Sequence, residues 1–449
     1  MVELLSPAGT LKNMRYAFAY GADAVYAGQP RYSLRVRNND FQLETLQTGI
    51  DEAHALGRKL FVASNLLPHE SKVKTYLRDM EPVIAMQPDA LIMADPGLIM
   101  MVRERWPDMA IHLSVQANTL NSAAVRFWQS AGVSRIILSR ELSLDEVAEI
   151  RQICPDIELE VFVHGALCIA YSGRCLLSGY FNHRDPNQGA CTNACRWQYD
   201  IKSDEESSSG ETLPAEELLQ DPQPLSACGS QQRHPAAERG YLLREKSRPN
   251  ELLPIMEDEH GTYIMNSRDL RAVQHVARLV EIGVDSLKIE GRTKSHYYVA
   301  RTAQIYRQAV DDAVAGREFN WALMEALEGL ANRGYTDGFY QRVSSAAQQN
   351  YEHGSSTLAR QRFVGEVVEQ RGARALIAVK NRFAVGDAMV LITPDGETPF
   401  TLTAIENGRS GEAMDVAPGS GHQVWIELPK TASSFAILVR NEEAGAAAC

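Results

Sequence analysis

A chain of 449 residues is too long for one ordinary domain, so two or three domains are expected, and the length leaves room for a large α/β barrel among them. With 45% hydrophobic and 23% charged residues the composition is globular, and no apolar run is long enough to span a bilayer. The net charge of −12 gives no overall basic footprint for nucleic acid, but seven acidic residues and no basic ones fall in 203–222, which leaves room for a local basic surface elsewhere.

Short apolar runs alternate with helical patterns through the first 165 residues, and one more run follows much later. Each run is nearly continuous, as expected of parallel strands that helices cover on both faces. The eight runs are 2–9, 24–28, 59–65, 90–96, 111–119, 135–142, 157–165 and 283–291. Eight such units predict an α/β fold of the TIM type, a (β/α)8 barrel with its site at the C-terminal ends of the strands. A doubly wound sheet is the alternative, which the missing G-x-G-x-x-G motif disfavours.

Polar residues at the strand ends are expected to gather around one mouth of this barrel. They are Ser6, Asn65, Asp95, Gln116, Asn118, Arg140, His164 and Glu290. Ser6 and Asp95 fit helix caps at least as well as functional groups. His164 fits a proton donor, a ligand or a buried core histidine. Glu160 alternates with apolar neighbours, so we expect it to face the barrel lumen, where a carboxylate needs a partner.

A cysteine-rich insertion, 166–282, separates the seventh strand from the eighth. Its cysteines follow the pattern C-x6-C-x15-C-x3-C, at Cys168, Cys175, Cys191 and Cys195. The N-terminus lacks a secretory signal, so we expect a cytoplasmic protein whose thiols are reduced and bind metal or do redox chemistry. Buried core cysteines, structural zinc and an iron–sulfur cluster all remain open, because the spacing alone does not separate zinc from a cluster.

The remaining segments complete the expected architecture. Cys154, at a helix end, is expected to be structural. Within the insertion we expect 203–240 to be flexible and 266–282 to be helical. A helix over 295–315 closes a barrel domain that spans 1–318. A linker, 319–361, leads to alternating short strands that predict a small C-terminal antiparallel β-barrel over 362–440, followed by a tail, 441–449.

Basic residues follow two of the predicted strands. Lys288, Glu290, Arg292 and Lys294 form a charged end of the eighth strand, where Arg292 and Lys294 are suited to clamp a carboxylate or phosphate. The run at 31–41 adds three arginines after the second strand. The sequence has no evident Ser/His/Asp triad, H-E-x-x-H motif or P-loop.

Five segments together resemble peptidase family U32 over most of the chain. They are EVFVHGALCIAYSGRCLLS at 160–178, SPAG at 6–9, DAVYAG at 23–28, NHRDPNQGACTNACRW at 182–197 and KIEGR at 288–292. The members that the chain resembles most support oxygen-independent, prephenate-dependent formation of 5-hydroxyuridine at the tRNA wobble position. Other relatives act in hydroxylation of ribosomal RNA and of ubiquinone precursors, and the latter carry a [4Fe–4S] cluster on four cysteines.

The resemblance implies a cytoplasmic tRNA uridine hydroxylase that uses prephenate and depends on the iron–sulfur assembly machinery. Cluster ligands would be Cys168, Cys175, Cys191 and Cys195, with Cys228 open as an alternative fourth ligand. His164 or Glu160 would handle protons, and Arg292 with Arg140 or Lys294 would bind an anion such as prephenate or a tRNA phosphate. Glu290 completes the candidate catalytic set, and the C-terminal barrel would help to dock the tRNA.

Two other functions stay open. A collagenase-like U32 peptidase would need a thiolate paired with a histidine, and His164 with Cys168 is the only near pair in the sequence. The other is a scaffold protein built around structural zinc.

Overall fold

The computed structural model describes residues 2–29, 31–34, 40–167, 268–332, 334–341, 361–432 and 434–442, together with the backbone of four strands inside the insertion. Eight parallel strands form a closed barrel in the order β13-β1-β2-β3-β4-β5-β6-β7, and a pairing between β13 and β7 closes it. The strands are β1 (Glu3–Pro7), β2 (Ala24–Gly28), β3 (Lys59–Ser64), β4 (Ala90–Met93), β5 (Ile111–Leu113), β6 (Arg135–Ile137), β7 (Glu158–Ala166) and β13 (Ser286–Ile289). The predicted TIM-type barrel is confirmed.

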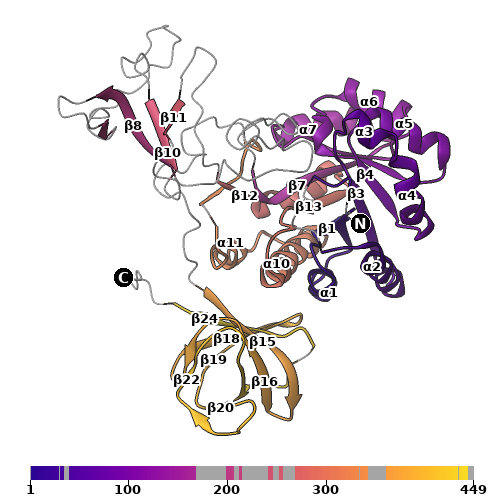
Figure 1. Cartoon of the computed structure of the whole chain (residues 1–449). Helices are drawn as coiled ribbons and strands as arrows, with labels where there is room; N and C mark the ends of the chain where they lie inside the picture. The colour runs from indigo at the N-terminus through magenta and orange to yellow at the C-terminus, as the bar shows by residue number, and fades with distance from the viewer. Residues whose placement is uncertain are drawn as a thin grey trace.

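Helices cover the outside of this barrel (Figure 1). They are α1 (Leu11–Ala19), α2 (Leu43–Ala55), α3 (Glu70–Val73), α4 (Tyr76–Ala85), α5 (Pro96–Arg105), α6 (Ser122–Ser130), α7 (Leu144–Ile153), α9 (Val276–Ile282) and α10 (His296–Val314), with α11 (Ala322–Glu328) beyond. Polar side chains at the N-caps start several of them, as Thr10 does for α1 and Ser143 with Glu146 for α7. None of the helices in the described residues is long and apolar enough to cross a membrane.

Strand β7 is longer than its neighbours, and its far end is paired by a segment that the sequence pattern assigns to a helix. Residues 266–282 were expected to be helical, but β12 (Asp269–Arg271) pairs antiparallel with the end of β7, and only then do η7 (Val273–His275) and α9 follow. The exposed edge of β7 beyond the barrel needs hydrogen-bond partners, and this tertiary demand outweighs local helix propensity. Strand β14 (Tyr335–Thr336) pairs in turn with β12.

Inside the insertion, four strands form an antiparallel sheet in the order β11-β10-β8-β9. They are β8 (Tyr199–Glu206), β9 (Thr212–Pro214), β10 (Tyr241–Glu245) and β11 (Leu252–Ile255). The end of β8 and all of β9 fall within 203–240, whose expected flexibility stays a prediction, since most of that range lies outside the described residues.

The C-terminal region is an antiparallel β structure that curls around its own apolar core (Figure 1). Its larger sheet has the order β19-β18-β24-β15-β16-β23-β20-β21, and β17 pairs with β22. The strands are β15 (Gln361–Arg371), β16 (Arg374–Val379), β17 (Phe383–Ala384), β18 (Ala388–Thr393), β19 (Gly396–Thr401), β20 (Ile405–Asn407), β21 (Ala413–Met414), β22 (Val416–Ala417), β23 (Gln423–Glu427) and β24 (Ile437–Asn441). The predicted fold class of this region is confirmed.

Apolar and polar contacts join this region to α1 and α10 of the barrel. Four of its side chains belong to the same apolar core as the barrel; they are Val390, Ile392, Ile437 and Val439. Tyr20 of α1 donates a hydrogen bond to the Phe435 carbonyl at 2.9 Å, and Gln304 of α10 donates to the Thr393 carbonyl at 2.9 Å. The interface therefore combines a shared core with directed hydrogen bonds.

Glu366 of β15 is the buried acid of this interface. Lys12 donates to its carboxylate at 2.6 Å, Tyr16 donates at 3.2 Å, and His296 lies 3.1 Å away. Burial alone would raise the pKa of Glu366, but His296 and Lys12 outweigh it and hold the pKa well below its usual value. The carboxylate therefore stabilises the folded state in its ionised form.

We expect Glu366→Gln to lower the stability of the full chain at pH 7 by about 1–3 kcal/mol, because Lys12 and His296 lose a charged acceptor. The pKa is depressed in the folded state, so the ionised carboxylate stabilises fully above its unfolded pKa, near 4.5. The difference in Tm between wild type and variant should shrink as the pH falls below that value. Glu397→Gln is the control, since Glu397 is 41% exposed and pairs with Arg301 at the same interface. A difference in Tm that does not change with pH would contradict this assignment.

Candidate active site in the barrel interior and mouth

Several predicted mouth residues hold the loops at the C-terminal ends of the strands. Asn65, after β3, accepts a hydrogen bond from the Leu34 amide at 3.2 Å and donates to Ser114 at 3.2 Å, so it joins the loops that follow β2 and β5. Asn118 has a left-handed backbone, with φ of 53°, and accepts from Ser139 at 2.9 Å. These two amides shape the mouth.

Three more of the eight predicted mouth residues, Asp95, Ser6 and Gln116, differ in what they do. Asp95 caps α5 by accepting from the Leu98 amide at 2.9 Å, which confirms the capping interpretation. The Ser6 hydroxyl is buried, and none of the described residues forms a hydrogen bond with it. Gln116 lies in the short helix η2 (Val115–Ala117), directly after β5.

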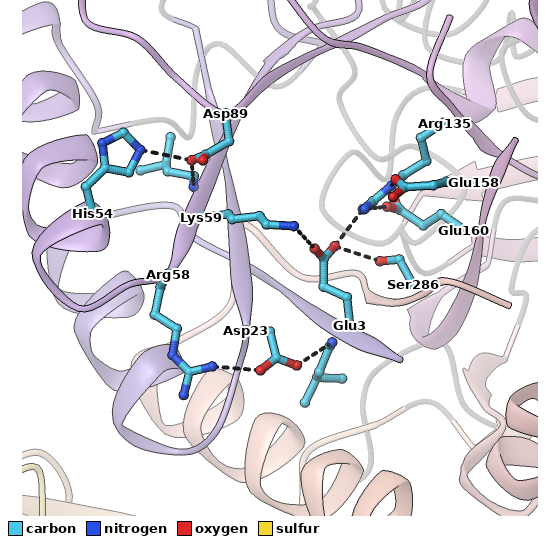
Figure 2. A network of polar contacts seen from close by, with 12 residues as sticks. Glu3, Asp23, His54, Arg58, Lys59, Asp89, Arg135, Glu158, Glu160 and Ser286 are labelled. Carbon is cyan, nitrogen blue, oxygen red and sulfur yellow. Dashed lines mark hydrogen bonds and ion pairs between the residues drawn. The ribbon is translucent and has the colours of Figure 1, made fainter. Parts of the chain in front are cut away.

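Below the mouth, charged side chains fill the N-terminal end of the lumen (Figure 2). The buried Arg135 guanidinium at the start of β6 faces three carboxylates, with contacts of 2.6 Å to Glu3, 2.8 Å to Glu158 and 3.1 Å to Glu160. Burial alone would raise the pKa of Glu3, but Arg135 outweighs it, so the pKa is lowered. Lys59 also pairs with Glu3, at 3.2 Å, from the outer rim, where it is 53% exposed.

Glu160 links these charges to the upper half of the barrel. As predicted, it points into the lumen, and its carboxylate is fully buried between Arg135 and Lys288. The Lys288 ammonium donates to it at 2.7 Å. Burial lowers the pKa of Lys288, and the facing carboxylate opposes that change. The site therefore contains a buried ion pair halfway up the barrel.

Above this pair, two aromatic rings lie among three cations. The Lys288 ammonium is 4.5 Å from the ring centre of Tyr26 and 5.6 Å from that of Phe162. The Arg140 guanidinium lies 4.1 Å over Phe162, and the Arg292 guanidinium lies 5.9 Å from Tyr26. Cations over aromatic faces are held in place while they remain available to an anion.

Each of the two guanidiniums donates a hydrogen bond to a neutral oxygen. Arg292 donates to Ser33 at 2.7 Å, and Arg140 donates to the Ala166 carbonyl at 2.5 Å. Within the part of the chain that the structure describes, the buried Arg140 Nε has no hydrogen-bond partner. An unmet buried donor of this kind favours an acceptor supplied by a ligand.

His164 faces away from the lumen. The register between β7 and β13 shifts at Lys288/Ile289, and beyond this bulge the imidazole packs among the rings of Tyr298, Tyr306 and Tyr335. Burial lowers the pKa of His164 to about 3, so the ring is neutral near pH 7. Glu160 and His164 therefore lie on opposite faces of β7.

Glu290 follows the end of β13, beside this bulge. Its amide donates to the His164 carbonyl at 2.9 Å, and its carbonyl accepts from the Tyr298 hydroxyl at 3.0 Å. The backbone of Glu290 thus ties β7, β13 and α10 together at the mouth.

Comparison with known proteins assigns this arrangement to a family. Residues 9–350 match Peptidase family U32, and residues 359–440 match the Peptidase family U32 C-terminal domain. The chain belongs to peptidase family U32.

Curated relatives within this U32 family cover nearly the whole chain. The tRNA hydroxylation protein P of Escherichia coli is 59% identical over 443 residues, which is 98% of this chain and 96% of that protein. The protein of the same name from Haemophilus influenzae is 56% identical, with the same coverage. A collagenase of Porphyromonas gingivalis is 25% identical over 92% of this chain and 94% of its own length.

The cysteine ligands predicted for this U32 chain, Cys168, Cys175, Cys191 and Cys195, lie outside the described residues, as do Cys228 and the arginines at 35 and 37. In the part of the chain that the structure describes, no three His, Cys, Asp or Glu side chains come together as a metal site. Cys154 is buried at the end of α7, and its thiol contacts the Ser122 carbonyl at 3.7 Å, which confirms its structural role.

Sequence reasoning left Arg135, Tyr26 and Lys288 out of the candidate set for this U32 site. A usable signal was present, because Arg135 and Lys288 are charges in short apolar strands. In a barrel strand alternate residues face the lumen, so an isolated charge there needs an interior partner. The Lys294 ammonium lies 5.2 Å from the ring centre of Tyr298, a residue of α10.

Proposed function

We propose that this chain hydroxylates a uridine of tRNA at the wobble position and forms 5-hydroxyuridine in an oxygen-independent, prephenate-dependent reaction. The observation that carries the proposal is the 59% identity, over 98% of the chain, to a protein named for tRNA hydroxylation. At this identity and coverage, barrel, insertion and C-terminal region are all shared. The reaction would take place in the cytoplasm, where tRNA and prephenate are available.

A mouth lined by cations suits both proposed substrates. Prephenate carries carboxylates and tRNA carries phosphates, and Arg140 and Arg292 are suited to bind either kind of anion. Phe162 and Tyr26 hold these guanidiniums from below. We assign anion binding to Arg140 and Arg292, with Lys294 as a further cation at the rim.

Of the two side chains predicted to handle protons, we favour Glu160 as part of the site. Glu160 faces the lumen and contacts Lys288, whereas His164 is neutral and enclosed by three tyrosines on the side of α10. The placement of His164 also argues against a role as the base of a cysteine peptidase. A base of that kind pairs with the cysteine thiol, whereas the Nδ1 of His164 lies 3.3 Å from the Tyr306 hydroxyl.

We further propose that a [4Fe–4S] cluster is held by Cys168, Cys175, Cys191 and Cys195, in the segment that continues from β7 in the sequence. Four thiolates are the donor set that such a cluster needs, and Cys228 is the alternative fourth ligand. The cluster, loaded by the iron–sulfur assembly machinery, would supply one-electron chemistry. Anaerobic purification should give brown protein with about four irons per chain. Colourless protein with one zinc would replace the cluster with a structural metal.

Cys175→Ala should abolish 5-hydroxyuridine and the nucleosides derived from it in tRNA, when it is the only copy in a strain that lacks the wild-type protein. The reason is that the proposed cluster would lose one of the four thiolates that hold it in this chain. The measurement is mass spectrometry of nucleosides from digested tRNA. Cys154→Ala is the matched control, because Cys154 is a structural cysteine outside the site, and it should keep the modification.

Unchanged nucleosides in the Cys175→Ala strain would contradict the proposed function. Cleavage of a protein substrate by the purified chain would then favour the peptidase activity that the name of the collagenase relative suggests.

A further inference from the structure

Lys288 is a buried ammonium for which a purely structural role is an incomplete explanation. Its side chain is 4% exposed, and among the described residues it donates a hydrogen bond to Glu160. A buried charge is unfavourable unless it is paired and its hydrogen bonds are made. An ammonium has three donors, so a single carboxylate leaves capacity for a further acceptor.

The strand register places Lys288 on the mouth side of the charged floor. Ser286 pairs with Glu160, and Lys288 pairs with Phe162, so Lys288 starts two residues nearer the mouth and reaches down to the carboxylate. Its ammonium shares the ring of Phe162 with Arg140 and the ring of Tyr26 with Arg292. Lys288 is therefore the member of the ion network that borders the mouth.

Three other charges of the network, Glu160, Arg135 and Glu3, hold this ammonium in place. Glu160 offers one oxygen to Lys288 at 2.7 Å and the other to Arg135 at 3.1 Å. Arg135 is itself fixed from the opposite side by Glu3, at 2.6 Å. Because Arg135 holds the Glu160 carboxylate in place, that carboxylate keeps the Lys288 ammonium beside the rings of Tyr26 and Phe162.

A second observation points to an acceptor at the same level. The Arg140 guanidinium lies 4.1 Å from the ring centre of Phe162, and its Nε is buried without a hydrogen-bond partner among the described residues. An ammonium with spare donors and a guanidinium with an unmet donor thus lie against one aromatic ring. A carboxylate attached to a small carbon ring would satisfy the donors and pack on the aromatic faces.

We propose that Lys288 binds a carboxylate of a small cyclic organic acid at the base of the mouth, and that Glu160 and Arg135 are the positioning residues that hold its ammonium there. The proposal rests on the proposed function, in which prephenate is such an acid. Lys288 then lies below the ligand, and Arg140 lies beside the ligand.

The test is isothermal titration of prephenate into the anaerobically purified full chain. Lys288→Met, which keeps the length of the side chain and removes the charge, should weaken binding at least about tenfold. Lys59→Met is the matched control: Lys59 belongs to the same network but sits on the exposed rim of the opposite end. It should bind prephenate like wild type.

Lys288→Met leaves Glu160 with one partner fewer, so Tm is measured for every variant. If the single variant does not fold, the double variant Lys288→Met/Glu160→Gln replaces it, because removing both members of the pair leaves no unpaired buried charge. In an assay of tRNA hydroxylation, the folded variant should show a raised KM for prephenate, which a merely structural role would not produce.

Each outcome decides a different point. A folded variant without Lys288 that binds prephenate as tightly as wild type overturns the role of Lys288 and leaves the proposed function standing. Wild-type protein that binds no prephenate overturns the proposed co-substrate, and with it the ligand that we assign to Lys288.

Discussion

Removal of the Glu160 carboxylate in Glu160→Ala is expected to destabilise the barrel by about 3–5 kcal/mol, the largest effect of any single change in the lumen. The variant leaves the Lys288 ammonium, held at 2.7 Å in the wild type, without its carboxylate in a buried site. Arg135 also loses one of its three carboxylates. An uncompensated buried charge costs far more than the pair itself contributes, and this difference sets the expected magnitude.

The measurement is the midpoint of the barrel's unfolding transition in urea, followed by far-UV circular dichroism. Glu158→Gln is the control, because Glu158 contacts the same guanidinium at 2.8 Å but is 51% exposed. Exposed ion-pair partners contribute little to stability, so Glu158→Gln should lower the free energy of unfolding by no more than about 1 kcal/mol. Equal losses in the two variants would show that the lumen is wet enough to solvate Lys288, and the description of the site as a buried ion pair would fail.

Gly165→Ala is expected to destabilise the chain by roughly 2–5 kcal/mol and to disturb the mouth. Gly165 follows His164 in β7 and has a φ of 106°, a conformation that side chains rarely adopt. A Cβ there would lie 2.5 Å from the Glu290 carbonyl oxygen, which belongs to the backbone and cannot rotate away. Strands β7 and β13 would have to separate where the Glu290 amide bonds the His164 carbonyl.

Gly283→Ala is the control for this change. Gly283 has a similar φ of 85° and leads into β13, but a Cβ there would meet no atom within 4 Å. It should lose only about 1 kcal/mol, the cost of the backbone conformation alone. Thermal unfolding of the two variants separates the steric effect from the conformational one. If both lose the same amount, the close approach of β7 and β13 does not constrain this position.

The strands of the barrel could be predicted from the sequence because each is buried on both faces, and a short continuous apolar run marks such a strand directly. The lumen-facing position of Glu160 followed from alternation in the same way. Asp95 was assigned to a cap because Asp followed by Pro at the start of a helix is a local signal. These features depend on a few neighbouring residues, which a single sequence displays.

The features that could not be predicted depend on contacts between distant segments. The orientation of His164 is set by a bulge against β13, more than a hundred residues away, and strict alternation would have turned its ring into the lumen. Strand β12 forms because the far edge of β7 needs partners, a demand that its own sequence does not show. Lys288 was treated as one charge in a strand end, and only the closed barrel brings it against Phe162 and Tyr26.

The apolar core that the barrel shares with the C-terminal region has a consequence for the synthesis of the chain. Ile437 and Val439 are made well after β13, the last strand of the barrel, yet they belong to the same core as the side chains of β1 and α1. A nascent barrel therefore emerges from the ribosome with part of its helical layer uncovered, and it stays so until β24 has been made. Domains usually fold in order as they are made. In this chain the barrel reaches its final burial only when the C-terminal region packs against it, so the unfinished barrel leaves apolar side chains exposed.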